Sequence, residues 1–465
     1  ASDVYKRQYL AIGLFLEAEE VNQTAVNLSE IHYGKNSLAY GESLFLRGKI
    51  YAAIGNNKQS IDYFKTSINI LEKVLGSEHL AVAYAYQEIA LTYLNHDKKE
   101  LKQDAKKLLD NAKGIIDKNL GNQNIAYATV LKNLAKYYIV FEEYNQALSI
   151  LTEANLIWKQ LEKDFKNPEG TAKINLLMAK ILEKQGNTKD AINYYSKSIT
   201  SYENIFDDKH PKYLHAKSQM GKLFYALKED IKALELLNQT TSAYLEYIEN
   251  YFPGLSEREK MQFWQMIRND FEFYYCIAVK NSKHRPKALE NVFNFRLITK
   301  SLLLNSSLKM RKKILESDNE LLIDLYKEWT TKRDLLDKKR HISSEHKQEI
   351  KISEEDLLED INLLEKELNK ETLFKENYKQ KNITIKNIKN SLKENQYAVE
   401  IIRYRYYDQN LTDSIIYVAL VLEGNSKKGI KSIVLGNGNE MENKYFSFYT
   451  NSLSLIHISE PTRLG

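Results

Sequence analysis

Small and large apolar residues recur in the first half of this chain at regular intervals. Five times a small residue is followed three positions later by a large one, in the pairs Gly48/Tyr51, Ala90/Tyr93, Ala135/Tyr138, Ala179/Leu182 and Gly221/Phe224. The small residues stand 42, 45, 44 and 42 positions apart. A period of this length predicts a solenoid, because one short unit cannot bury its apolar face without neighbours.

Each unit carries further positions at fixed distances from its small residue. Small, large and small side chains follow after 12, 16 and 19 positions, at Ser60, Phe64 and Ser67; Ala147, Leu151 and Ala154; Ala191, Tyr195 and Ser198; Ala233, Leu237 and Thr240. In the second unit the same series, Ala105, Leu109 and Ala112, comes three positions later. The pattern predicts two antiparallel helices per unit that approach closely at the small residues. Gly55 and Gly186 fall at the turn between them, where a positive φ suits glycine.

This repeat resembles the tetratricopeptide repeat (TPR). The segments between units, LGSEHLAVA (75–83) and FDDKHPKYLHA (206–216), are similar to those of the kinesin-light-chain type. The resemblance covers residues 9–250 as five full repeats, preceded by a half repeat with Gly13, Ala18 and Ala25. It implies an α-α superhelix that binds a protein or peptide in its concave groove. We interpret His79 and His210 as residues of helix-start loops rather than metal ligands.

In a TPR the first helix of each pair lines the groove, and the position after the small residue faces it. These positions hold Lys49, Leu91, Lys136, Lys180 and Lys222, and Lys132 lies one turn before Lys136. The resemblance therefore implies a row of lysines that could hold an acidic peptide or a C-terminal carboxylate. The alternative is that these lysines are ordinary solvated side chains of a lysine-rich protein.

Helical patterns continue through residues 251–392 without the repeat register. An amphipathic aromatic-rich helix is predicted over 256–279, and it contains the single cysteine, Cys276, which we interpret as a buried structural thiol. Charged helices are predicted over 318–340 and 353–370. The apolar stripe Leu357, Ile361, Leu364 and Leu368, together with a Ser353 N-cap, favours an antiparallel helical hairpin.

The pattern changes again near residue 397. The segments 397–407, 414–424 and 429–436 are rich in β-branched and aromatic residues, with DQNLTD and GNSKKG between them. They predict a β-meander or a hairpin that opens a new domain over 393–453. GNGNE (436–440) reads as a turn, because no Gly-Lys-Ser/Thr follows it.

The second half resembles the entry into a CHAT domain. ITKSLLLNSSLKMR (298–311) is similar to the KGLLL-type segment before that domain, with Lys300 in the lysine position and Ser301 where glycine is common. The acidic leucine-rich helix, ITIKNIKNSLKENQYAVEIIRY and YVALVLEG follow in the family's order. The resemblance implies a caspase-like α/β fold with a cysteine-peptidase His/Cys dyad. Neither Cys276 nor His457 corresponds to that dyad, so we expect no proteolytic activity from this chain.

Composition narrows the function classes. The 465 residues carry a net charge of only +5, which argues against nucleic-acid binding, and their longest apolar run, 415–422, is too short to span a membrane. One cysteine allows no internal disulfide and favours a reducing cytoplasm, and the alternative is an export signal on an N-terminus that this sequence does not include. The residues indicate no metal site, cofactor site or phosphate loop.

Both ends of the sequence are unusual. ASDVYKRQ (1–8) and SLIHISEPTRLG (454–465) resemble translated sequencing-adapter DNA, so we expect an internal piece of a longer protein. The alternative is a genuine but odd terminus. Two functional hypotheses stay open: a TPR scaffold attached to a caspase-like peptidase, or a non-enzymatic scaffold with a degenerate CHAT domain.

Overall fold

The computed structural model describes residues 15–53, 56–96, 98–165, 169–206, 208–251, 257–315, 319–341, 354–373, 384–408, 410–424 and 429–449. The chain divides into two compact units, residues 1–223 and 224–465. Gly13, Gly55, Ser353 and His457 lie outside the described residues.

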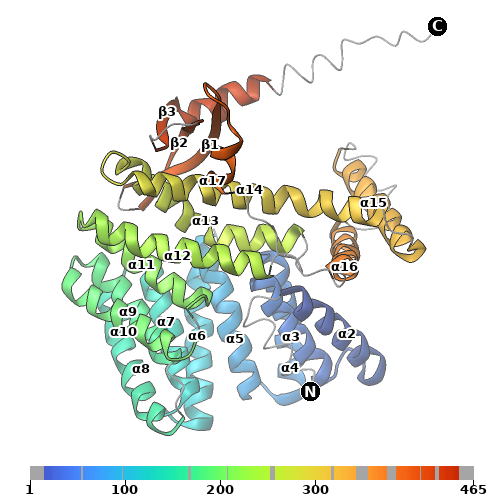
Figure 1. Ribbon diagram of the computed structural model, residues 1–465. Coiled ribbons are helices and arrows are strands. Elements are labelled where there is room, and N and C mark those ends of the chain that lie inside the picture. The colour runs from blue at the N-terminus through green and yellow to red at the C-terminus, as the bar shows by residue number, and fades with distance from the viewer. Residues whose placement is uncertain are drawn as a thin grey trace. The chain divides into compact units, whose positions relative to one another are not determined.

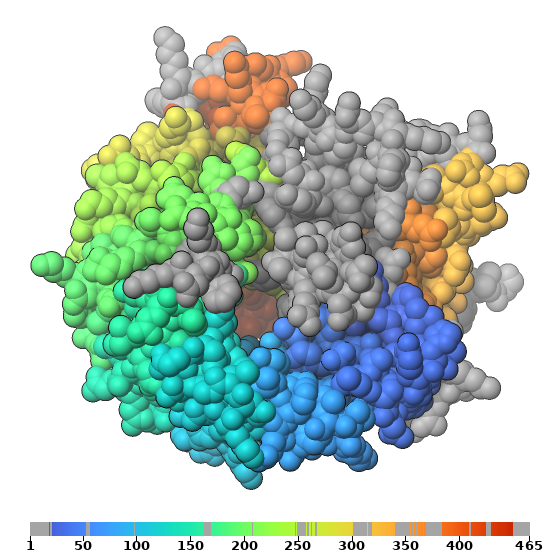
Figure 2. All heavy atoms as spheres, turned by 90° about the horizontal axis from the view of Figure 1, so that it is seen from below, coloured from blue at the N-terminus to red at the C-terminus, as the bar shows by residue number. Residues whose placement is uncertain are grey.

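Unit 1 is built from helix pairs that follow one another (Figure 1), and its residues run along an arc in chain order (Figure 2). A single helix, α2 (Phe15–Tyr33), comes before them. The pairs are α3 (Leu38–Ala53) with α4 (Asn57–Leu75), α5 (Leu80–Leu94) with α6 (Lys99–Leu120), α7 (Ile125–Val140) with α8 (Tyr144–Phe165), and α9 (Glu169–Lys184) with α10 (Thr188–Glu203), followed by α11 (Pro211–Ala226). The predicted α-α superhelix is confirmed.

The core of the helix pairs coincides with the repeat register of the sequence. The five small residues at the reference position are all buried, and all fifteen side chains at the three later positions are 0% exposed. A Cβ atom on Gly48 would stand only 2.7 Å from the ring of Phe64. The Ser60 hydroxyl donates to the Gly48 carbonyl oxygen at 2.9 Å. Small residues are therefore needed where the two backbones approach, and large ones fill the space beside them.

A side chain eleven positions before the reference residue begins the first helix of several pairs. His79 Nδ1 accepts a hydrogen bond from the Ala81 amide at 3.1 Å, and His210 Nδ1 accepts one from the Lys212 amide at 3.2 Å. Asn124 caps α7 in the same way. These contacts satisfy amides that the helix itself leaves without partners. The interpretation of both histidines as helix-start residues is confirmed.

In the three repeats whose turns are described, a left-handed residue stands seven positions after the reference residue. Gly186 has φ 78° there, but Glu142 has φ 61° and Lys228 has φ 63°. The left-handed region costs a non-glycine residue about 1 to 2 kcal/mol. The turn geometry is thus set by the helix pair rather than by glycine, and glycine only lowers its cost.

Two glycine substitutions should therefore change stability in opposite directions. We expect Gly186→Ala to lower the free energy of unfolding by about 1 kcal/mol, because alanine must adopt a positive φ. Gly114 is exposed within α6, and a Cβ there would meet no atom within 4 Å. Gly114→Ala should raise the free energy of unfolding by about 0.5 to 1 kcal/mol through helix propensity. Urea denaturation followed by circular dichroism measures both, and equal signs would contradict the assignment of the turn.

Unit 2 is largely helical up to residue 391. Its helices are α12 (Asp230–Tyr251), α13 (Glu257–Lys280), α14 (Pro286–Leu315), α15 (Glu320–His341), α16 (Glu354–Leu373) and α17 (Ile385–Ser391). Helices α15 and α16 form the predicted hairpin. Its apolar cluster includes Trp329 and Leu336 together with the expected stripe Leu357, Ile361, Leu364 and Leu368.

The remaining described segment is a three-stranded antiparallel sheet in the order β1-β2-β3, as the sequence predicts. The strands are β1 (Tyr397–Asp408), β2 (Asn410–Glu423) and β3 (Lys431–Asn437), followed by α18 (Gly438–Glu440) and a π-helical turn, η3 (Met441–Tyr445). The expected loop over 408–413 is wrong in extent. A bulge between Arg405 and Tyr407 lets the ladder continue to the pair Asp408/Asn410, so the hairpin is much tighter.

One face of the sheet packs on α13 and α14. Ile402, Val418 and Leu420 on that face are 0% exposed. The ring centroids of Tyr407 on β1 and Phe273 on α13 are 4.0 Å apart. Cys276 is 3% exposed among these residues, so its predicted burial is confirmed, and this burial raises the pKa of its thiol.

Candidate functional site

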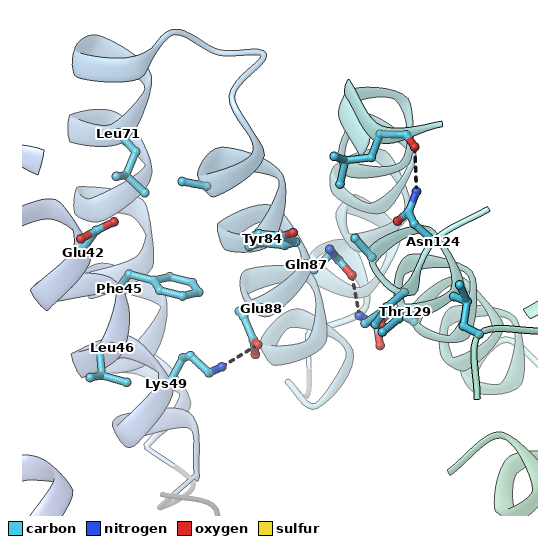
Figure 3. A pocket seen from close by; sticks show the side chains of 16 residues that line it. Glu42, Phe45, Leu46, Lys49, Leu71, Tyr84, Gln87, Glu88, Asn124 and Thr129 are labelled. Carbon is cyan, nitrogen blue, oxygen red and sulfur yellow. Dashed lines mark hydrogen bonds and ion pairs between the residues drawn. The ribbon is translucent and has the colours of Figure 1, made fainter. Parts of the chain in front are cut away.

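The first helices of three neighbouring pairs enclose a hollow of about 920 Å³ in unit 1. Figure 3 shows side chains from α3, α5 and α7 turned toward it. Its walls are mainly apolar, with Phe45, Leu46, Tyr84 and Ile125 among the lining residues. A hollow of this size and character suits a large side chain of a ligand.

The lining residues occupy equivalent positions in their repeats. Most of them lie six, three or two positions before the small reference residue of their repeat, or one position after it. These residues are Glu42, Phe45, Leu46 and Lys49 on α3; Tyr84, Gln87 and Glu88 on α5; and Thr129 and Asn133 on α7. The repeat therefore sets which side chains face the hollow. Lys49 is the one predicted lysine among the described lining residues.

A buried amide lies at the base of this hollow. The Nδ2 group of Asn133 donates to Gln87 Oε1 at 3.0 Å, and Asn133 is 3% exposed. Its Oδ1 atom is buried and has no hydrogen-bond partner. A buried acceptor without a partner costs roughly 1 to 3 kcal/mol. A ligand N–H group that reached Oδ1 would recover part of this energy.

Acidic side chains pair with one lysine of the predicted row and with two lysines near it. Lys49 Nζ lies 3.1 Å from Glu88 Oε1, across the gap between α3 and α5 (Figure 3). On α9, Glu169 accepts from Lys173 at 2.6 Å and from Lys212 at 2.8 Å. Burial opposes ionisation of Glu169, but these two hydrogen bonds outweigh it and lower its pKa to about 2.

Lys132 and Lys136 are two lysines of the row whose charged form is disfavoured by burial. Both are half-buried on α7, and within the described part of the chain neither ammonium group has an ion-pair partner. Burial, assisted by the charges of Lys136 and Lys173 and opposed by Glu88 and Glu169, lowers the pKa of Lys132 to about 7. Burial also lowers the pKa of Lys136. The groove thus holds positive charge at a place where it is poorly solvated.

The remaining predicted positions besides Lys49 are Lys180, Lys222 and Leu91, and they do not belong to this pair. Lys180 Nζ on α9 lies 3.5 Å from His215 Nε2 on α11. Lys222 is half-buried on α11, and Leu91 is half-buried on α5. The structure therefore brings Lys132 and Lys136 together with Lys173, a neighbour that was not predicted. Lys173 lies six positions before its reference residue, which is a groove-facing position, so the register alone could have found it.

The described residues show neither a candidate metal site nor a candidate membrane span. They contain no group of three or more His, Cys, Asp or Glu side chains placed to hold a metal ion. No helix among them is long and apolar enough to cross a membrane.

Comparisons with known proteins agree with the repeat register. A family model described as tetratricopeptide repeat matches residues 170–246, from α9 to α12. The helices within this stretch are therefore of the tetratricopeptide-repeat type. A search of curated protein sequences finds no match.

Several solved structures are similar to parts of the chain. NprR in complex with its cognate peptide NprX has 17% identity and a TM-score of 0.44, covering 67% of this chain and 84% of NprR. BtubC (BKLC) from P. vanneervenii has 15% identity and a TM-score of 0.37, covering 44% of this chain and 81% of its own. Aspartyl phosphate phosphatase F from Bacillus subtilis has 14% identity and a TM-score of 0.39, covering 64% and 92%.

Proposed function

We propose that unit 1 binds an extended peptide segment of a partner protein in its groove. The observation that carries this proposal is the apolar hollow of about 920 Å³ enclosed by α3, α5 and α7. The unpartnered Oδ1 atom of Asn133, one of the lining residues, adds a side-chain amide acceptor. An extended peptide can supply both complementary groups: a large apolar side chain for the hollow and a free N–H group for the acceptor.

The charge of the groove favours an acidic ligand. Lys132 and Lys136 stand one helical turn apart, and burial lowers the pKa of both ammonium groups. A carboxylate between them would offset their desolvation and their mutual repulsion. Such a carboxylate can come from an aspartate or glutamate side chain or from a C-terminus.

Capped peptides with a single tryptophan test this proposal. One set has aspartates on both sides of the tryptophan, the second has asparagines in the same places, and the third has asparagines with a free C-terminal carboxylate. We expect fluorescence polarisation to show affinity about tenfold higher for the aspartate or the free-carboxylate set than for the capped asparagine set. The comparison also identifies the source of the carboxylate. Equal affinities for all three sets would refute an acidic ligand.

Two substitutions separate the apolar and charged parts of the site. Tyr84 lines the hollow but is 41% exposed, so Tyr84→Ala should weaken binding about tenfold without disturbing the core. Lys136→Ala should weaken only the acidic peptides. Tyr33 is 72% exposed on α2 and serves as the matched control, for which Tyr33→Ala should leave affinity unchanged.

The sheet of unit 2 is the basis for a second proposed function. Its outer face carries Val399, Ile401 and Ile433, which are 55%, 50% and 52% exposed. Exposed apolar patches of this kind often mark a surface that another segment or a partner covers. This exposed apolar face supports the resemblance to a CHAT domain, and with it a peptidase guided by the peptide-binding unit. Sequencing the source locus past Tyr449 tests it: a histidine and a cysteine at later strand ends would support a peptidase, and their absence would leave a non-enzymatic scaffold.

A further inference from the structure

A second hollow, of about 560 Å³, lies within unit 2 where α13, α14 and the β1-β2 hairpin meet. Its described lining includes four basic side chains, Arg268, Arg296, Lys300 and Arg403. It includes only two acidic ones, Glu272 and Glu400. This site is separate from the peptide groove and does not depend on the function proposed for it.

Glu272 fixes one half of the basic array. Its carboxylate is 3% exposed and accepts from Arg268 Nε at 2.5 Å and from Arg405 Nε at 2.8 Å. Arg403 Nη1 stands 3.8 Å from the same carboxylate. Arg403 and Arg405 on β1 and Arg268 on α13 are thus held around the buried Glu272 carboxylate. One carboxylate fixes the three guanidinium groups in place but cannot neutralise all of them.

Glu400 fixes the other half. Arg296 Nε lies 3.2 Å from Glu400 Oε1, and Lys300 Nζ lies 3.3 Å from Oε2. The Lys300 side chain is 50% exposed, so it reaches the open side of the hollow. Glu400 itself is 8% exposed.

Arg403 connects the array to the end of the sheet. Its Nε and Nη2 atoms donate to the Glu442 carboxylate at 2.6 and 3.0 Å, and the Tyr417 hydroxyl donates to the same group at 2.8 Å. The hydrogen bond from Arg403 holds the pKa of Glu442 below its usual value. The remaining nitrogen, Nη1, is buried and makes no hydrogen bond. It lies 3.8 Å from Glu272 Oε1, so Arg403 bridges the carboxylates of Glu272 and Glu442 and holds that edge of the hollow in place.

The charges of this region do not balance. The basic members are Arg268, Arg296, Lys300, Arg403 and Arg405, and the acidic members that hold them are Glu272, Glu400 and Glu442. The array keeps an excess of two positive charges, which matches a phosphate group.

One wall of the same hollow is aromatic. Trp264, Phe271, Tyr275 and Tyr417 are among its lining residues. The rings of Trp264 and Phe271 are 5.1 Å apart, and Trp264 is half-buried. An indole at the edge of a basic hollow can stack on a flat heteroaromatic ring.

We propose that this hollow binds a small phosphorylated molecule that carries an aromatic ring, of the nucleotide class. The phosphates lie among Arg268, Arg296 and Lys300, whose side chains line the hollow and are 41%, 40% and 50% exposed, and the ring lies against Trp264. Because the ligand contacts α13, α14 and β1 at once, it ties the sheet to the helices that support it.

Calorimetric titration of the full chain with ADP, pyrophosphate and adenosine tests this proposal. We expect saturable binding of ADP, weaker binding of pyrophosphate, and quenching of tryptophan fluorescence by ADP that Trp264→Phe removes. Absence of binding by ADP and pyrophosphate would overturn the site. Equal affinity for both would overturn the role of the aromatic wall.

Substitution of Lys300 gives a matched comparison. Lys300→Gln leaves Glu400 paired with Arg296 and should lower ADP affinity about tenfold, whereas Lys300→Arg should retain it. The control is Lys444→Gln, since Lys444 is 70% exposed, pairs with Glu440 at 3.4 Å and does not line the hollow. Unchanged affinity in Lys300→Gln, or an equal loss in Lys444→Gln, would contradict a specific phosphate site.

Discussion

Lys132→Met is expected to stabilise the free protein while it weakens the binding of an acidic peptide. Methionine keeps the volume of the lysine stem but removes an ammonium group that burial and the charges of Lys136 and Lys173 disfavour. We expect the free energy of unfolding to rise by about 1 to 2 kcal/mol at pH 6. Peptide affinity should fall by more than about tenfold, because the same charge is what the carboxylate needs.

The stability gain of Lys132→Met should depend on pH in one direction. The pKa of Lys132 is about 7 in the folded protein and 10.5 in its unperturbed state. Between these values the unfolded chain binds more protons, so the stability of the unaltered protein rises as pH increases from about 7 to 10.5. The gain from Lys132→Met is therefore largest below pH 7 and shrinks above it. Urea denaturation at pH 6, 8 and 9.5 measures this trend.

Lys107→Met is the matched control for this experiment. Lys107 is exposed on α6, the second helix of its pair, and does not line the groove hollow. Its replacement should change the free energy of unfolding by less than about 0.5 kcal/mol and leave peptide affinity unaltered. Equal free energies of unfolding for Lys132→Met and Lys107→Met at every pH would contradict this prediction, because they would mean that water solvates the Lys132 ammonium group as well as that of an exposed lysine.

The sequence predicted the helix pairs well because their packing is encoded locally. Close approach of two helices demands a small residue on each, and large residues must fill the space beside them. This requirement recurs with each pair, so the amino-acid pattern alone is enough to assign positions such as Gly48 and Phe64 to the core. The three strands were equally visible, since β-branched and aromatic residues cluster in short segments bounded by turn residues.

The electrostatics of the groove could not be predicted in the same way. The lysine positions followed from the repeat, but the acidic residues near them, Glu88 and Glu169, belong to neighbouring helices. Whether an ammonium group is paired, as in Lys49, or desolvated, as in Lys132, depends on the spacing between helices. A repeat period does not contain that information. The tight β1-β2 hairpin was missed for a related reason, since a bulge near Tyr407 depends on pairing rather than on composition.

Glu272→Gln should have the largest effect on the stability of unit 2. The buried carboxylate of Glu272 accepts from Arg268 on α13 and from Arg405 on β1. Glutamine keeps the shape but leaves these guanidinium groups, and Arg403 beside them, without their shared anion. Breaking a buried ion pair by removing one partner costs about 3 to 5 kcal/mol. We expect faster hydrogen exchange of the β1 amides and a loss of about that size in the free energy of unfolding.

Glu440→Gln provides the comparison, because it removes an ion pair of a different kind from the same unit. The Glu440 side chain is 42% exposed and pairs with Lys444 at 3.4 Å. An exposed pair contributes at most about 1 kcal/mol, so exchange in β1 should hardly change. If Glu272→Gln behaved like Glu440→Gln, water would already solvate the three arginines. The sheet would then be held on α13 by its apolar face alone, through contacts such as Phe273 with Tyr407.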